Sequence, residues 1–199
     1  MTIINVTVKG IGPMLQAKHP TPEEEAMILS RASNPKAKAK DLTELEMFNM
    51  RSYKVNNKFV QPGEMFEAAM TKAAVAFKLE GKKTYKDAFK GGIIVEEELI
   101  VHKNQKVKTI KDEPKDQKTW YIDARWGRNP STRGAVWVVR PRINKWELDF
   151  TINVLLDELI PIDIVKKVLE YAGLYIGVGA WRPKFGRFSI DKFDVIDSK

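Results

Sequence analysis

Two stretches of this sequence interleave basic residues with aromatic ones, a combination that fits a surface binding nucleic acid. The first runs from Trp120 to Arg142 and the second from Gly177 to Arg187. Arginine binds phosphate through two parallel hydrogen bonds and stacks on flat rings, while aromatic side chains offer faces on which unpaired bases stack. The candidate binding residues are Arg125, Trp126, Arg128, Arg133, Arg140, Arg142, Trp181, Arg182, Lys184 and Arg187.

Each stretch also has an explanation that involves no ligand. The first would then be a solvated loop beside an exposed strand face, because charged loops usually face water. In the second, glycine lets the backbone approach either a phosphate or a neighbouring segment, so it also fits a tightly packed helix-to-strand crossover with Trp181 and Phe185 in the core. The glycines expected to shape this loop are Gly173, Gly177, Gly179 and Gly186.

Residues suited to catalysis or metal binding are sparse. The only histidines, His19 and His102, lie far apart, and the sequence has no cysteine. A divalent ion could bind between Glu96-Glu97-Glu98 and Asp123 or Asp149. However, adjacent strand residues point to opposite faces, so at most two of the three glutamates can converge. The sequence lacks a Walker loop, a His-Glu-x-x-His motif and a nucleophile elbow. We therefore expect no catalytic residue, no metal and no cofactor.

The overall charge favours a polyanionic partner. The 34 Lys and Arg residues against 26 Asp and Glu residues give a formal charge of +8, which attracts nucleic acid and releases its counterions. A charged fraction of 30% and a hydrophobic fraction of 43% are typical of a folded protein. The absence of cysteine fits a reducing compartment. Because the N-terminus reads neither as a leader nor as a membrane span, we expect a cytoplasmic protein with no membrane contact.

Hydrophobic periodicity predicts the elements that position these residues. Alternation predicts strands over 3–9, 59–63, 93–101, 135–142, 146–154 and 187–195, and helical spacing predicts helices over 64–78 and 161–171, the second stopped by Gly173. The short connection 143–145 predicts a hairpin between 135–142 and 146–154.

Two regions between these elements have a different composition. Between residues 20 and 53 we expect a helix near 21–31, a Lys-Ala linker over 36–40 and a second helix that opens with the capping box Asp41-Leu42-Thr43-Glu44. The Lys-rich segment 103–118 is polar and lacks periodicity, which predicts a long mobile loop or hairpin.

In order, the elements read β, insertion, α, β, loop, β-hairpin, α, β. This order predicts an α+β fold with a ferredoxin-like or RNA-recognition-type βαββαβ core and large insertions after the first and second strands. We expect a single nucleic-acid-binding domain over 1–199, with insertions at approximately 13–58 and 103–133. An unrelated α+β sheet is the alternative for the same string of elements.

The segment Gly177 to Phe188, which reads GVGAWRPKFGRF, resembles the end of a family of uncharacterised phage and prophage proteins. The proline and Ala/Glu-rich helix of 62–74 and the triplet Arg140-Pro141-Arg142 add to this similarity. More distantly, the plan resembles the repeat-associated (RAMP) superfamily, which supplies the backbone subunits of CRISPR effector complexes. That resemblance implies a protein that multimerises along single-stranded nucleic acid, and it transfers no catalytic residue.

Together these observations predict a sequence-nonspecific protein that binds single-stranded DNA or RNA and oligomerises along the strand as a homo-oligomer or filament. The phage resemblance implies a role in genome replication or recombination in the host cytoplasm. One alternative is a structural or interaction protein of a phage particle, in which the basic charge is incidental and the glycine loop is packing. A metal-dependent nuclease is the third hypothesis.

Overall fold

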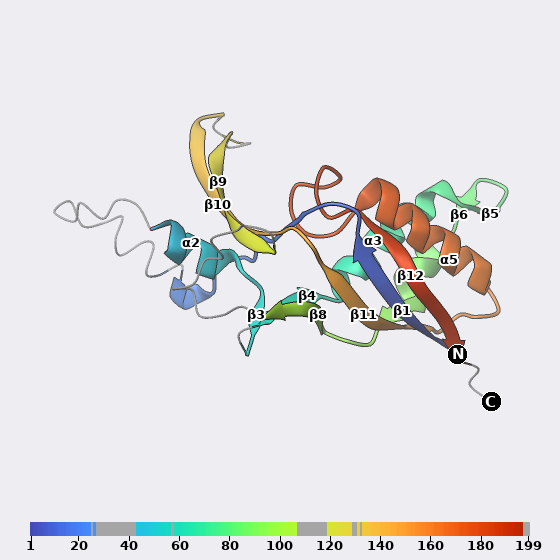
Figure 1. Cartoon of the computed structure of the whole chain (residues 1–199). Helices are drawn as coiled ribbons and strands as arrows, with labels where there is room; N and C mark the ends of the chain where they lie inside the picture. The colour runs from blue at the N-terminus through green and yellow to red at the C-terminus, as the bar shows by residue number, and fades with distance from the viewer. Residues whose placement is uncertain are drawn as a thin grey trace.

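The protein has an α+β structure, described here by a computed structural model, and its largest element is an antiparallel sheet (Figure 1). The structure describes residues 1–24, 26, 43–56, 58–106, 119–128, 131 and 133–196. Strands of this main sheet lie in the order β12-β1-β11-β8-β4-β3, and β7 also pairs with β11. Their bounds are β1 Thr2–Gly10, β3 Lys54–Val55, β4 Lys58–Pro62, β7 Ile93–Val95, β8 Leu99–Lys106, β11 Glu147–Val154 and β12 Phe188–Ile196. The first and last strands are therefore neighbours, drawn as the adjacent blue and red arrows of Figure 1.

Strand β1 alternates because one of its sides faces the core. Its residues Ile4, Val6 and Val8 are buried, as period-two side chains on the inner face of a sheet should be. Both of its neighbours, β11 and β12, run antiparallel to it. The strands expected over 3–9 and 187–195 are thus confirmed, each to within one residue at either end.

Two helices pack on the buried face of the main sheet. Helix α3 spans Glu64–Ala73, and helix α5 spans Ile162–Tyr171. The Phe66 ring of α3 lies 4.5 Å from the Phe150 ring of β11 and 5.5 Å from the Phe188 ring of β12, measured between centroids. Through these contacts α3 joins the strands on either side of β1 in one core.

A second, three-stranded sheet has the order β2-β10-β9. Its strands are β2 Met14–Leu15, β9 Trp120–Arg128 and β10 Ala135–Ile143. Helix α2, Glu44–Arg51, packs against it, with the Phe48 ring stacked 5.2 Å from that of Trp120. Figure 1 shows β9 and β10 rising away from the main sheet. The first basic and aromatic stretch therefore forms a hairpin of its own.

The expected hairpin between 135–142 and 146–154 is wrong. Strand β10 pairs with β9, from Ala135 opposite Arg128 to Ile143 opposite Trp120, whereas β11 pairs with β1 in the main sheet. The buried Trp146 explains the change of sheet. Its indole Nε1 donates to the Gly12 carbonyl at 2.9 Å, and its own carbonyl accepts from the Gly10 amide at 2.9 Å. The connection therefore bridges two sheets instead of closing a turn.

Two other expected elements are shorter than the sequence indicates. The helix expected over 64–78 ends at Ala73 and continues as the 3₁₀ turn η1, Ala74–Ala76, before a small hairpin. The expected strand over 93–101 is broken at Glu96–Glu98. At this break Glu97 is not part of a strand, and its carboxylate accepts hydrogen bonds from the amide and hydroxyl of Thr151 at 2.8 and 3.0 Å. The remaining elements here are β5 Lys78–Glu80, β6 Lys83–Thr84 and α4 Lys86–Gly92.

Two helix boundaries also differ from expectation. Gly173 does not stop α5, because a π-helical turn, η2, continues over Ala172–Ile176 and ends at Gly177, whose φ of 72° terminates it. The capping box of α2 is formed by Thr43 and Glu46, not by Asp41.

Several expectations fall partly or wholly on residues outside the description. Asp41, the linker 36–40 and most of the expected helix 21–31 are among them. Within 103–118, where a long loop or hairpin was expected, residues 103–106 belong to strand β8, and residues 107–118 lie outside the description. No helix among the described residues is long and apolar enough to cross a membrane.

Candidate nucleic-acid interface

The glycine loop, residues 177–187, is anchored where the two sheets meet. Its Ala180 amide donates to the Leu15 carbonyl of β2 at 2.7 Å, and its Gly186 amide donates to the Pro13 carbonyl at 2.8 Å. A third bond, 2.9 Å long, joins the Val178 amide to the Gly186 carbonyl within the loop. The loop is therefore held by backbone on both sides.

The glycines of this loop fit against the protein's own backbone. At Gly186, where φ is 76°, an added Cβ would lie 1.7 Å from the Val178 carbonyl oxygen. At Gly179, with a φ of 81°, it would lie 2.5 Å from the Leu15 carbonyl oxygen. Only glycine avoids both the clash and the unfavourable φ. A Cβ added at Gly173 or Gly177 would likewise meet backbone, with the nearest carbonyl oxygens 2.3 and 3.0 Å away, respectively. These contacts are those of a tightly packed crossover.

Trp181 is the exposed aromatic residue of the glycine loop. Its side chain is 46% exposed, and its φ of 56° places it in the left-handed region, which bulky residues rarely adopt. The buried Phe185 packs beneath it with ring centroids 5.6 Å apart. Strain of this kind persists where the surrounding structure holds it. The loop therefore presents one indole in a fixed position.

Three cations surround the Trp181 ring. The guanidinium carbons of Arg125 and Arg140 lie 5.3 and 5.9 Å from its centroid, and Lys184 Nζ lies 5.3 Å away. Arg142 packs on Phe185 at 5.6 Å. Distances of this order give cation–π attraction. The Trp181 cluster consists of Trp181, Phe185, Arg125, Arg140, Arg142 and Lys184.

Buried Asp123 orients two arginines of the Trp181 cluster. Arg125 donates from Nε to Asp123 Oδ1 at 2.6 Å and makes a second bond from Nη2 to Oδ2. Arg142 Nη1 lies 3.6 Å from Asp123 Oδ2, and its Nε donates to Asn144 at 3.0 Å. The hydrogen bond that Arg125 donates to Asp123 raises the pKa of Arg125. One carboxylate therefore serves two guanidinium groups, which leaves the cluster net positive.

Arg140 is half-buried and, among the described residues, has no hydrogen bond or ion pair. Burial lowers the pKa of Arg140, and the nearby charge of Arg51 lowers it further. Asp123 raises this pKa and Arg125 lowers it, both to a smaller extent. An arginine in this setting gains from an added anion. Arg51 ends helix α2 and was not among the expected residues, since no motif marks it.

The other expected residues lie outside the Trp181 cluster. Trp126 of β9 lies opposite Trp137 of β10, on the face away from Arg125. The two rings meet edge to face at 5.3 Å, and Trp126 is 69% exposed. Arg128 and Arg133 are exposed near the far end of this hairpin. The glycine loop also carries Arg182 and Arg187, both exposed and outside the described ring contacts.

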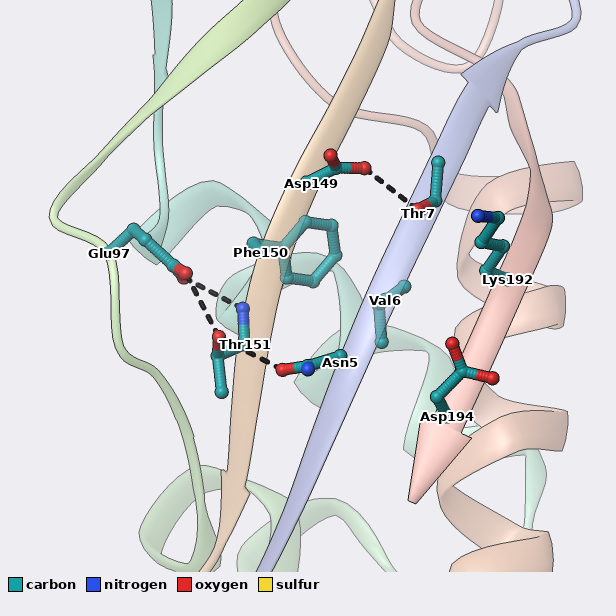
Figure 2. A pocket seen from close by; sticks show the side chains of 9 residues that line it. All are labelled: Asn5, Val6, Thr7, Glu97, Asp149, Phe150, Thr151, Lys192 and Asp194. Atoms are coloured by element: carbon teal, nitrogen blue, oxygen red, sulfur yellow. Dashed lines mark hydrogen bonds between the residues drawn. The ribbon is translucent and has the colours of Figure 1, made fainter. Parts of the chain in front are cut away.

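The open face of the main sheet is a poor surface for nucleic acid. It holds a pocket of about 230 Å³, shown in Figure 2, that carries three carboxylates, Glu97, Asp149 and Asp194, against one cation, Lys192. Thr7 donates to Asp149 at 2.7 Å, which is one of the dashed bonds in the figure. An RNA-recognition domain stacks bases on aromatic residues of this face. Here three of the lining side chains are carboxylates, and two of them, Glu97 and Asp149, accept hydrogen bonds from threonines.

The described residues do not assemble a metal site. Among them no group of three His, Asp or Glu side chains is placed to hold an ion. Asp149 pairs with Lys103, and Asp123 pairs with arginines, so neither faces Glu96–Glu98 as a free ligand. His102 is buried against Phe59 and Trp146, and burial lowers its pKa to about 4.

Comparison with known proteins gives a likeness of fold. No family model matches the chain, and no curated protein matches it. A chain in the cryo-EM structure of the Type III-B Cmr-beta bound to cognate target RNA superposes with a TM-score of 0.57 at 12% sequence identity. The match covers 98% of this chain and 60% of that one, so this protein spans less than two thirds of its neighbour's length. At this level of identity the likeness concerns the fold alone.

Proposed function

We propose that this protein binds single-stranded nucleic acid on the Trp181 cluster. The observation that carries the proposal is the half-exposed Trp181 ring with Arg125, Arg140 and Lys184 each within 6 Å of its centroid. A base stacks on the indole, and the adjoining phosphates pair with the cations around it. Base stacking contributes about 1–3 kcal/mol per base, and each phosphate contact adds counterion release.

The preference for single strands follows from this geometry. A ring face accepts a base only when that base is unpaired, and stacking discriminates little between bases. We therefore propose low sequence specificity. We propose additional contacts to a longer strand from Trp126 on the other face of the β9–β10 hairpin, from Arg128 and Arg133 near its far end, and from Arg182 and Arg187 of the glycine loop.

The fold supports this proposal by analogy. We propose that the main sheet and its helices form a ferredoxin-like βαββαβ core, and the order β12-β1-β11-β8 with α3 and α5 on one face supports this proposal. The neighbour with a similar fold belongs to an assembly bound to cognate target RNA, which makes RNA as suitable a ligand to test as single-stranded DNA. We further propose a non-enzymatic protein that forms homo-oligomers along the strand and serves phage genome replication or recombination in the host cytoplasm.

Fluorescence anisotropy tests the proposal with labelled single-stranded DNA, single-stranded RNA and blunt duplex of matched length. We expect tighter binding to both single strands than to duplex, with log Kd rising linearly with log salt concentration. Equal affinity for duplex and single strand would contradict the stacking geometry. A magnesium-dependent cleavage assay on the same oligonucleotides tests the non-enzymatic role, and cleavage would overturn it.

A further inference from the structure

Helices α3 and α4 enclose an apolar groove of about 610 Å³ that the nucleic-acid proposal does not use. Ala68 and Val75 line it from α3 and the adjoining η1, and Phe89 and Ile93 line it from α4 and the start of β7. Val75 is 51% exposed. Surface helices normally turn polar residues to water, so the exposed Ala68 and Val75 beside this recess call for an explanation.

The rim of this groove is basic. Lys72, Lys86 and Lys90 line it, and all three are exposed and have no ion pair or hydrogen bond within the described chain. Two glutamates also line the groove. One of them, Glu67, is committed to the fold, because its carboxylate accepts a hydrogen bond from the Val95 amide at 2.7 Å. The available charge at the rim is therefore positive and favours an anionic partner.

The chemistry of the floor favours a protein partner over nucleic acid. Among the described residues no arginine lines the groove, and its one ring, Phe89, is buried, so the groove offers neither a bidentate phosphate partner nor a ring on which a base could stack. We propose that the groove binds an amphipathic helical segment of a partner protein, whose apolar face enters the groove and whose flanking carboxylates pair with the three lysines. Helix-in-groove recognition combines the same two elements, an apolar seam and a charged rim.

Synthetic peptides test this inference on the full-length protein. The probe is a labelled amphipathic helix with leucines at i, i+3, i+4 and i+7 and glutamates beside them. One control keeps the leucines and replaces glutamate with lysine, and the other keeps the glutamates and replaces leucine with serine. In anisotropy titrations we expect the acidic amphipathic peptide to bind about tenfold or more tightly than either control. Equal binding of the serine peptide would overturn the apolar part of the proposal.

A charge-reversal variant, K72E/K86E/K90E, tests the rim. We expect it to lose the acidic peptide and to gain the lysine peptide, each by about tenfold. The matched control is K78E/K82E/K83E, which changes the net charge equally at exposed lysines outside the groove. Val75→Arg tests the floor without touching the rim, and circular dichroism melting verifies that each variant folds.

Oligonucleotide titrations of the same variants separate this inference from the proposed function. If the rim variant binds peptide normally but loses single-stranded nucleic acid beyond the loss seen in the charge control, the groove is part of a nucleic-acid surface and the peptide proposal is wrong. If neither the wild type nor any variant binds oligonucleotide, the proposed function is wrong, but the peptide titrations still test the groove on their own. If both charge variants lose affinity for the acidic peptide to the same extent, the effect depends on net charge alone and the inference is wrong.

Discussion

Asp123 and Arg140 lie directly opposite each other on β9 and β10, yet the Asp123 carboxylate pairs with Arg125 and Arg142 instead of Arg140. Arg140 is therefore the arginine of the Trp181 cluster that has no anionic partner in the described structure. Arg140 is also half-buried beside the charge of Arg51. Both the loss of hydration and the repulsion from Arg51 disfavour its positive charge. Its removal should affect binding and stability differently from removal of its neighbours.

The variant Arg140→Gln should bind single strands more weakly without losing stability. If Arg140 makes one phosphate contact, its loss lowers the slope of log affinity against log salt by about 0.7. The free energy of unfolding should change by no more than about 0.5 kcal/mol or rise, because repulsion with Arg51 is relieved. Salt-dependent anisotropy and urea denaturation measure the two quantities.

Asp123→Asn is the matched contrast for Arg140→Gln. It should destabilise the protein by about 1–3 kcal/mol, because the buried acceptor of Arg125 loses its charge. An Arg140→Gln protein with normal folding and an unchanged salt slope would remove Arg140 from the interface.

Trp181→Ala should weaken single-strand binding and leave the salt slope unchanged. The loss of one stacked base amounts to about 1–3 kcal/mol, or roughly 5-fold to 150-fold in Kd. No charge is removed, so the number of displaced counterions stays the same. Trp181→Phe keeps a ring and should retain most of the affinity. Loss of duplex and single-strand binding to the same extent would argue against stacking at this position.

Local patterns were sufficient to predict β1, β12 and α5, because alternation and helical spacing depend on neighbouring residues alone. Strand pairing was less predictable. The short connection at 143–145 predicted a hairpin, but Trp146 forms hydrogen bonds to residues 10 and 12, more than 130 positions away in sequence. Contacts at such separation leave no local signal, so the distribution of strands between two sheets could not be predicted.

The candidate interface was partly predictable for the same reason. Composition predicted Arg125, Arg140, Lys184 and Trp181 as candidate binding residues, and the structure brings these four together. What joins them is the anchoring of the glycine loop on β2, a nonlocal contact. The contact between Asp123 and Arg125 did have a local signal in the sequence. Side chains two positions apart in a strand lie on the same face, and Asp123 and Arg125 are two positions apart.

Gly186→Ala should destabilise the protein whatever its ligand. Its Cβ would lie 1.7 Å from the Val178 carbonyl oxygen at a φ of 76°, so backbone must move and the residue must adopt a strained conformation. We expect a loss of at least about 1–3 kcal/mol in the free energy of unfolding. Gly91→Ala is the control, because its Cβ meets nothing within 4 Å and it lies in helix α4. Alanine there should stabilise by about 0.5–1 kcal/mol. Equal melting temperatures for the two variants would contradict the packing of the glycine loop.

His102 should make the protein less stable as pH falls from about 6.5 to about 4. Neither ring nitrogen has a hydrogen-bond partner in the described structure, and burial lowers the pKa to about 4 from the usual 6.5. The unfolded chain therefore binds a proton at a higher pH than the folded chain does. The stability contribution of neutral His102 is complete above pH 6.5 and is lost progressively down to pH 4, by about 3 kcal/mol in total.

Carboxylates also titrate in this range, so the test of His102 is a difference between proteins. Urea denaturation at pH 4 to 8 should give a steeper fall in the free energy of unfolding for the wild type than for His102→Phe, which keeps a ring between Phe59 and Trp146 and cannot take a proton. His19→Gln is the matched control, because His19 is exposed and its removal should leave the wild-type profile intact. Parallel profiles for wild type and His102→Phe would show that this imidazole does not stay neutral in the folded core.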